Sequence, residues 1–162
     1  MAAVIDDADL KQKVDDLYAR YAHALCDGDL EAWPEFFVDD CLYKLTSRAN
    51  YERNLAIGPI FSETKGALID RTRALKSALV YAPRYVCYMV GSIRIVGRAP
   101  GKGWDTRSMF SAYQTFVDGD SNLMMCGRTF DRIVLDGDTA KFSRRVVVYD
   151  NERVPSAVVY PL

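Results

Sequence analysis

The chain has 162 residues, of which 49% are hydrophobic and 27% charged, a size and balance typical of one compact domain. The 21 basic and 22 acidic residues leave a net charge of −1, which excludes a strong general attraction to nucleic acid or to anionic membranes. No apolar run approaches the ~18 residues that a membrane span needs, and residues 1–9 carry Asp6, Asp7 and Asp9 in place of a basic region followed by an apolar core. We therefore predict one cytoplasmic domain over residues 1–162, with neither nucleic acid nor membrane as partner.

The cysteines are widely separated and form no Cys-x-x-Cys pair: Cys26, Cys41, Cys87 and Cys126. All of them fall in segments that we expect to be helix or strand. Free cysteine is among the most frequently buried residue types. We therefore expect four buried free thiols.

Apolar residues recur at three-, four- and seven-residue spacing from Leu10 to Leu25, which predicts a helix with Asp9 as N-cap and Gly28 as the left-handed stop. A short apolar element then follows from Asp29 through Phe37. A third helix is predicted from Ser62 up to residues 81–83, because the residue before a proline disfavours helical geometry.

Strand patterns dominate the rest of the chain. Alternation predicts a strand over residues 41–46, followed by a loop over residues 47–58. From residue 84 the period changes toward two and predicts strands at 84–89, 92–98, 106–117, 122–135 and 139–149. Gly- and Asp-rich turns at 100–103, 118–120 and 136–138 separate them. Helices followed by long strands predict an α+β fold, with helices on one face of an antiparallel sheet.

The sequence has one histidine, His23, and no Cys-x-His pair. A Rieske cluster and a two-His-one-carboxylate iron site each need two histidines, so we predict no iron in this chain. On a helical wheel His23 points roughly 190° from the apolar stripe, which favours a solvent-facing or subunit-facing residue over a general base. Gly101-Lys102-Gly103 lacks the spacing of a phosphate loop and is interpreted as a hairpin loop.

Two sets of charged residues have alternative interpretations. Asp39 and Asp40 form an acidic pair that could act as general acid and base, although a solvated turn between helix and strand is favoured. Arginines are frequent in the second half of the chain. They belong either to ion pairs across a subunit boundary or to the solvated face of the sheet. Those considered are Arg71, Arg73, Arg94, Arg128, Arg132, Arg144 and Arg145.

Residues 21–37, which begin Tyr-Ala-His-Ala-Leu-Cys-Asp-Gly, and residues 39–43 resemble the opening of the small (beta) subunits of aromatic-ring-hydroxylating dioxygenases. The resemblance continues through residues 50–53, 68–71, 127–133, 147–150, 154–155 and 160–162, and so spans nearly the whole chain. Within that family the chain is most similar to the small subunits of salicylate hydroxylases and terephthalate dioxygenases, which oxidise carboxylated benzenes.

The resemblance implies a cone-shaped fold similar to nuclear transport factor 2 and to SnoaL-like proteins, and an α3β3 assembly with a large subunit. In such enzymes the large subunit holds a Rieske [2Fe-2S] cluster and a mononuclear iron, and a reductase supplies electrons from NAD(P)H, sometimes through a ferredoxin. The small subunit then has no cofactor and a structural role. The subunit interface that we expect includes Arg71, Arg128, Arg132 and Tyr160.

The same cone fold also occurs in enzymes similar to ketosteroid isomerases and small dehydratases, which hold acid–base groups in an apolar pocket. Under that alternative Asp40 would be a carboxylate of raised pKa, assisted by Tyr43 or Tyr21. A stand-alone homo-oligomeric ligand-binding protein is a third class. The outward phase of His23 argues against an Asp-His pair and favours the structural subunit.

Overall fold

The computed structural model describes residues 7–77, 83–151, 153, 158 and 160–162. The first half contains α1 (Asp7–Cys26), the 3-10 helix η1 (Trp33–Phe36), β1 (Phe37–Ser47), α2 (Arg48–Glu52), β2 (Ile60–Ser62) and α3 (Lys65–Ser77). The second half consists of the long strands β3 (Arg84–Arg98), β4 (Trp104–Phe116), β5 (Ser121–Asp136) and β6 (Thr139–Tyr149). Helices first and long strands afterwards confirm the predicted α+β class.

The strands of the described residues form one six-stranded sheet with the order β2-β1-β6-β5-β4-β3. Strands β3 to β6 form an antiparallel meander, and Gly137 in its last turn has a φ of +63°. Strand β1, however, runs parallel to β6, so the predicted antiparallel sheet contains one parallel pair. No tight turn joins β1 to β6, and the direction of β1 is therefore set by its entry from η1 rather than by hairpin geometry.

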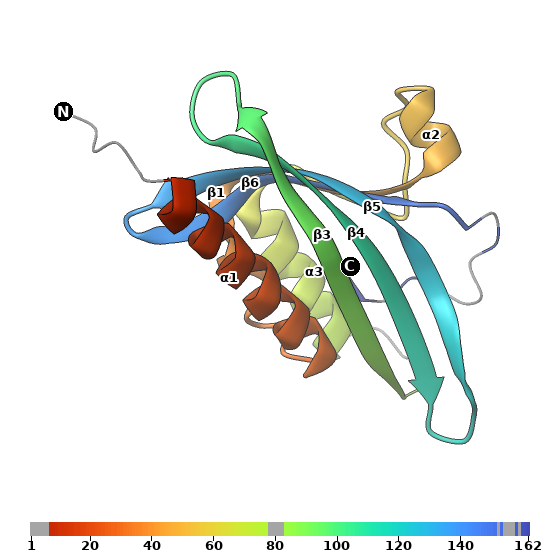
Figure 1. Ribbon diagram of the computed structural model, residues 1–162. Helices are drawn as coiled ribbons and strands as arrows, with labels where there is room; N and C mark the ends of the chain where they lie inside the picture. The colour runs from red at the N-terminus through yellow and green to blue at the C-terminus, as the bar shows by residue number, and fades with distance from the viewer. Residues whose placement is uncertain (1–6, 78–82, 152, 154–157, 159) are drawn as a thin grey trace.

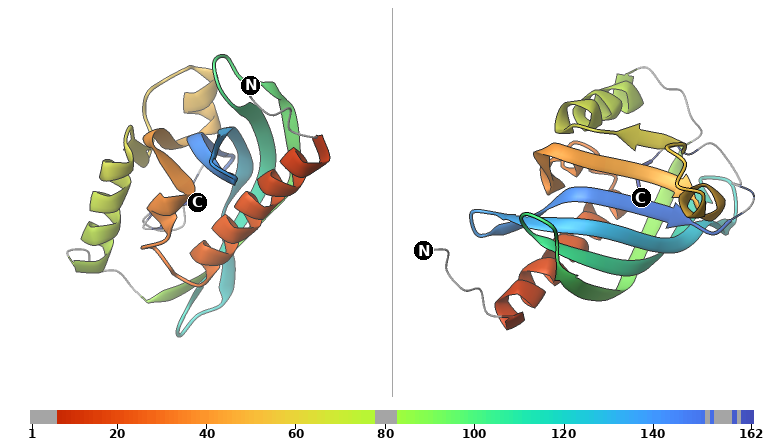
Figure 2. Two further views of the ribbon diagram at one scale, coloured as in Figure 1. Left: turned by 90° about the vertical axis from the view of Figure 1, so that its left-hand side faces the viewer. Right: turned by 90° about the horizontal axis from the view of Figure 1, so that it is seen from above.

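The sheet curls around the two long helices and forms a cone (Figures 1 and 2). Helix α1 packs against β3 and β6, and α3 packs against β1 and β2. The inward side chains of the sheet meet these helices in one apolar core that includes Leu17, Phe37 and Phe142, each fully buried. The concave face is therefore filled by helices, whereas no described element covers the convex, outer face over β3 and β4. Over β5, the ring of Tyr51 from α2 stacks on Phe130.

Two strands differ clearly from their predicted bounds, whereas β4 and β5 differ by only one or two residues at their ends and the short β2 lies where no strand was predicted. β1 begins at Phe37, so Asp39 and Asp40 lie within a strand and not in a turn. β3 is one strand where two were predicted, because a bulge between Gly91 and Arg94 interrupts the alternation but keeps the pairing with β4. Ser92 in this bulge has a φ of +53°, which kinks the strand.

The helices also depart from prediction at their ends. α1 begins at Asp7, so Asp9 lies in its first turn and is not the cap, whereas Gly28 has the predicted left-handed conformation with a φ of +72°. α3 begins at Lys65, because Ser62 pairs with Tyr43 as the last residue of β2. Its predicted end at residues 81–83 lies largely outside the described residues. The loop predicted at 47–58 contains α2.

The cysteines are free, but burial holds for only part of them. Cys41 is buried in β1, whereas Cys26 and Cys87 are exposed and Cys126 is half-buried. Cys87 lies on β3 between Val86 and Tyr88, which both point inward, so the alternation of the strand turns Cys87 outward. The prediction of four buried thiols is therefore wrong for Cys26, Cys87 and Cys126.

Candidate functional site

The interior of the cone contains a buried ion pair. Nη1 of Arg145 on β6 lies 2.8 Å from Oδ2 of Asp131 on β5, and both side chains are fully buried. The same oxygen accepts hydrogen bonds from the hydroxyls of Tyr18 at 2.6 Å and Thr129 at 2.7 Å. Three donors thus converge on one carboxylate oxygen at the centre of the core.

Arg145 differs from the other strand arginines because of a bulge. In the pairing of β5 with β6, Arg132 lies opposite Arg144 but Ile133 lies opposite Phe142, which leaves Ser143 as an extra residue. The alternation shifts by one at that point, so Arg144 faces out and Arg145 faces in. The two interpretations considered for Arg145, interface and solvent, are both wrong.

Aromatic rings surround the guanidinium of Arg145. It lies 4.3 Å from the ring centroid of Tyr21, and its Nη2 donates a hydrogen bond to the Tyr88 hydroxyl at 2.8 Å. Although burial by itself lowers the pKa of Arg145, Asp131 and the surrounding tyrosines raise it well above its ordinary value, so the group stays charged. Asp131 is 3% exposed and Arg145 0%, which leaves no path for a substrate. The pair organises the core.

Two of the three pocket candidates meet inside the cone. The hydroxyls of Tyr21 and Tyr43 both donate to the backbone oxygen of Leu162, at 3.0 Å and 2.9 Å. Asp40 is exposed and does not join them, because Cys41 and Tyr43 point inward from β1 and Asp40 does not. His23 is exposed on α1, as the helical wheel predicts. The acid–base group that the isomerase alternative needs is therefore not assembled.

The outer face of the sheet, over β3, β4 and β5, combines exposed apolar and basic side chains. Its exposed apolar residues, from Tyr85 at 74% to Tyr113 at 37%, are Tyr85, Met89, Val96, Met109, Tyr113 and Leu123. Arginines lie among them and extend to β6: Arg94, Arg107, Arg128, Arg132 and Arg144. We call these eleven residues the outer sheet face.

The arginines of the outer sheet face lie close to one another. Arg94 is directly opposite Arg107 across β3 and β4, and Arg132 is opposite Arg144 across β5 and β6. Like charges placed opposite each other destabilise a sheet. Within residues 84–149, Asp105 is the carboxylate that forms an ion pair with this group, at 2.9 Å from Nε of Arg132. The face therefore carries an excess of positive charge.

A hollow of about 360 Å³ opens in the outer sheet face at the β3 bulge. Arg94, Arg107 and Arg128 line it together with Met109 and Phe130. The guanidinium of Arg107 lies 5.3 Å from the ring centroid of Phe130, which holds it across the hollow. Such a hollow can receive an acidic side chain by charge-assisted hydrogen bonds.

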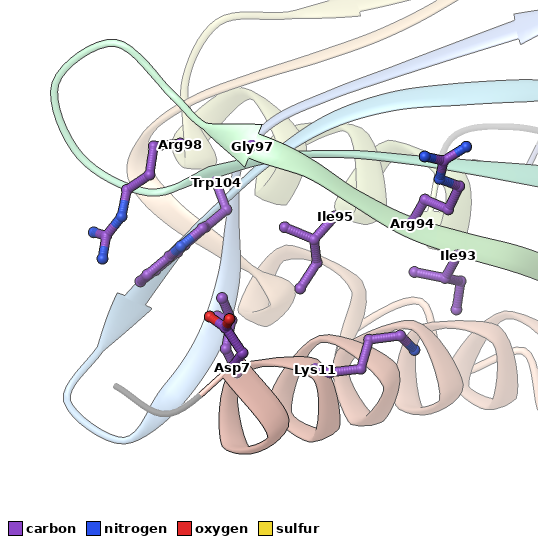
Figure 3. Close-up of a pocket in the computed structure, with 9 residues that line it drawn as sticks. Asp7, Lys11, Ile93, Arg94, Ile95, Gly97, Arg98 and Trp104 are labelled. Carbon is purple, nitrogen blue, oxygen red and sulfur yellow. The ribbon is translucent and has the colours of Figure 1, made fainter. Parts of the chain in front are cut away.

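A groove of about 520 Å³ lies between the start of α1 and the end of β3 (Figure 3). Ile93 and Ile95 point from β3 toward α1, and Lys11 lies below them on the helix (Figure 3). The guanidinium of Arg98 is 5.0 Å from the ring centroid of Trp104. Apolar and basic side chains therefore also lie together at the edge of the sheet, along β3.

The four predicted interface residues lie on two surfaces. Arg128 and Arg132 belong to the outer sheet face. Arg71 is half-buried on α3, where burial lowers its pKa and the charge of Tyr43 would raise it. Tyr160 packs against Leu30 and Leu75 beside the same helix. The sequence prediction omitted Arg107, which lies opposite Arg94 only because a bulge between Ile95 and Gly97 shifts the register of β3 and β4, so a simple alignment of the two strands from their loop does not find it.

In the described part of the chain, no group of three or more His, Cys, Asp or Glu side chains could hold a metal ion. These residues therefore do not fit a Rieske cluster or a mononuclear iron. None of the described helices is both long and apolar enough to cross a membrane.

The family model for the ring hydroxylating beta subunit matches residues 20–156. The chain belongs to this family. The anthranilate 1,2-dioxygenase small subunit of Burkholderia cepacia is 30% identical over 146 residues, which cover 90% of each chain. Subunit beta 1 of the terephthalate 1,2-dioxygenase terminal oxygenase component of Comamonas sp. is 23% identical, over 89% of this chain and 93% of the relative. The resemblance to dioxygenase small subunits is thereby confirmed, and it implies a larger partner subunit.

Solved structures confirm the predicted fold of this β-subunit family member. A crystal structure from Novosphingobium aromaticivorans, assigned as the beta subunit of an aromatic-ring-hydroxylating dioxygenase, is 30% identical with a TM-score of 0.85, over 97% of this chain and 100% of that one. A protein of the same organism assigned as a scytalone dehydratase shares the fold alone, at 15% identity and a TM-score of 0.66, over 94% and 95% of the two chains.

Proposed function

We propose that this chain is the non-catalytic β subunit of a Rieske non-haem iron ring-hydroxylating dioxygenase, and that its outer sheet face docks on the large subunit. The observation that carries the proposal is the composition of that face, in which arginine, tyrosine and methionine are exposed together. These residue types are enriched in protein interfaces. An obligate interface of this kind buries more than roughly 2,000 Å² in total, and the uncovered outer face offers a continuous surface for it.

The hollow at the β3 bulge supplies the specific contact in this proposal. Arg94, Arg107 and Arg128 would pair with one or two carboxylates of the large subunit, and Met109 would pack beside them. Arg132 belongs to the same surface, in line with its predicted interface role. Arg71 and Tyr160 would need a second contact surface on the α3 side, and their interface role stays a prediction.

The proposal assigns the chemistry to other chains. The large subunit would hold the Rieske [2Fe-2S] cluster and the mononuclear iron, and a reductase would pass electrons from NAD(P)H. The β subunit, one domain over residues 1–162, would support an α3β3 hexamer in the cytoplasm. The family membership and the filled interior of the cone support this division of roles, since the inward-facing Asp131 and Arg145 are inaccessible.

We further propose that the substrate of the assembly is a carboxylated benzene. The two relatives described above are named for anthranilate and terephthalate, which are both aromatic carboxylates. Because the large subunit would form the substrate pocket, the test uses the assembled enzyme. We expect product from benzoate, anthranilate or terephthalate, and substantially less from naphthalene. Preferred turnover of naphthalene would contradict the substrate assignment while leaving the subunit assignment intact.

The decisive experiment on the subunit role is native mass and iron content. The chain is expressed alone and together with the large dioxygenase subunit encoded nearest to it. We expect an iron-bearing complex with about three copies of each subunit, and an iron-free chain when it is expressed alone. A stable homo-oligomer that does not associate with the large subunit would overturn the proposal and favour the pocket-enzyme alternative.

Charge reversal locates the interface. The double change Arg107→Glu and Arg128→Glu should weaken association with the large subunit at least about tenfold, because it replaces two cations of the hollow by anions. Arg20→Glu is the control, since Arg20 is exposed on α1, away from both the outer sheet face and the α3 side. Equal effects of the two changes would place the interface elsewhere.

A further inference from the structure

The last residues of the sequence occupy the inside of the cone. The chain end lies between α1, α3 and the sheet (Figure 2, left view). Pro161 and Leu162 are both buried, and Leu162 is 0% exposed within the main core cluster. The contacts that hold Leu162 are made within this chain, on the side of the sheet opposite to the outer sheet face.

Leu162 is held through its backbone by a set of convergent polar groups. Its oxygen accepts hydrogen bonds from Tyr21 at 3.0 Å and from Tyr43 at 2.9 Å. Its amide nitrogen donates to the same Tyr43 hydroxyl at 2.8 Å. One hydroxyl thus recognises both the donor and the acceptor of one amino acid, and a second hydroxyl completes the coordination of its oxygen.

The two phenols are themselves fixed in place. Nε1 of Trp33 donates to the Tyr21 hydroxyl at 3.0 Å, which directs the Tyr21 proton toward Leu162. The rings of Trp33 and Tyr43 pack edge to face with centroids 5.1 Å apart. Burial raises the pKa of both Tyr21 and Tyr43, so the hydroxyls keep their protons and remain donors at neutral pH. Donors fixed in this way form a site that exists before its ligand arrives.

We propose that Tyr21, Tyr43 and Trp33 form a binding site for an N-acylated, branched aliphatic amino acid, and that Leu162 fills this site from within the same chain. The two hydroxyls on one oxygen select a carbonyl or carboxylate group. The hydrogen bond from the Leu162 nitrogen to Tyr43 requires an N–H on the same amino acid that carries this oxygen. The dry core around the side chain selects a branched apolar group over a polar one.

The site lies where the isomerase alternative would place its pocket, and its occupation explains why that pocket is closed. Tyr160, the residue that leads into it, packs on Leu30 and Leu75 and so joins the segment to α3. Removal of residues 160–162 should therefore open the site to a ligand supplied in solution.

The test is a chain that lacks residues 160–162, titrated with the peptide acetyl-Tyr-Pro-Leu. Calorimetry should show binding that is roughly tenfold to a hundredfold tighter than for acetyl-Tyr-Pro-Gly, since burial of an isobutyl group contributes that factor. The full-length chain should bind neither peptide, because its site is filled. Equal binding of the two peptides by the shortened chain, or no binding by a shortened chain that folds, would overturn the proposal.

A second variant separates the hydrogen bonds from the shape of the pocket. Tyr43→Phe in the shortened chain keeps the ring but removes the hydroxyl, and it should weaken the leucine peptide about threefold to tenfold. If the shortened chain is unfolded, the peptides are added during refolding and recovery is followed by circular dichroism. Recovery with the leucine peptide alone supports the proposal, and recovery with both peptides or with neither overturns it.

Discussion

Arg145 and Asp131 place opposite charges in the centre of the core, where every polar atom must find a partner or remain costly. Nε of Arg145 and Oδ1 of Asp131 have no hydrogen-bond partner among the described residues. A fully satisfied pair would have been easier to bury. The stability of the fold therefore depends on the contacts that Asp131 does make, with Arg145, Tyr18 and Thr129. Removal of one of the two charges should lower the free energy of unfolding strongly.

Asp131→Asn should lower the free energy of unfolding by about 3–5 kcal/mol, because it leaves the Arg145 cation buried without its counter-charge. Asp105→Asn is the matched control, because it breaks the ion pair of Asp105 with Arg132 on the outer face. The Arg132 side chain is 28% exposed and that of Asp105 43%, so the loss of this pair should cost less than about 1 kcal/mol. Urea denaturation measures both. Similar losses of unfolding free energy in the two variants would show that the buried pair stabilises the fold no more than the exposed pair does.

Asp40 and His23 provide the corresponding test of catalysis. Both are exposed, and neither lies near Tyr21 or Tyr43 in a shared pocket. Asp40→Ala and His23→Ala should each leave turnover by the assembled dioxygenase nearly unchanged, measured as product per assembled complex. A large loss of turnover with normal assembly would contradict the non-catalytic role of this chain.

At the scale of elements, bulges decide which face a side chain occupies. The extra residue Ser143 turns Arg145 inward, and the Gly91–Arg94 bulge opens the hollow beside Arg94 and Arg107. The strands between the bulges pack closely. A Cβ added to Gly127 of β5 would lie 2.0 Å from the backbone oxygen of Val148 on β6, so this pair of strands leaves no room for a side chain.

Gly127→Ala should therefore destabilise the protein by about 1–3 kcal/mol, since the two strands must separate to admit the methyl group. Gly91→Ala serves as the control, because no atom lies within 4 Å of a Cβ built there. Its effect should stay within about 0.5 kcal/mol. Thermal unfolding compares the two variants, and an equal tolerance of both would mean that β5 and β6 can adjust freely at Gly127.

For the whole molecule, the inner and outer faces of the sheet have different roles. The inner face is filled by helices, by the buried ion pair and by Leu162, whereas the outer sheet face is uncovered and basic. Each of the two faces carries a cysteine whose reactivity can be measured. Cys87 lies on the outer side of β3, opposite Tyr113, and Cys41 is buried under the helices on β1.

Alkylation by iodoacetamide at pH 8 should therefore label Cys87 quickly in the free chain and slowly in the complex with the large subunit. Cys41 should react slowly in both, because burial raises its pKa to about 11 and its thiolate is scarce. Cys26, exposed on α1, should stay reactive in both states. Peptide mass spectrometry gives the rates. Unchanged labelling of Cys87 in the complex would argue against docking through this face.

Features that depend on neighbours along the chain could be predicted from the amino-acid sequence. The apolar period of α1, the glycine stop at Gly28, the long β strands and the turn at Gly137 follow from residues a few positions apart. The family resemblance also lies in the linear order of residues. These features could be predicted because local sterics and the period of a helix or strand act on a few consecutive side chains.

The arrangement of groups that are distant in the chain, by contrast, is visible only in the folded molecule. It placed β1 parallel to β6, turned Arg145 inward onto Asp131, left Asp40 on the surface and put Leu162 between Tyr21 and Tyr43. The inward position of Arg145 depends on strand register, where one extra residue reverses the face of every side chain that follows. Such a shift is selected by packing across the sheet, and the packing partner lies tens of residues away along the chain.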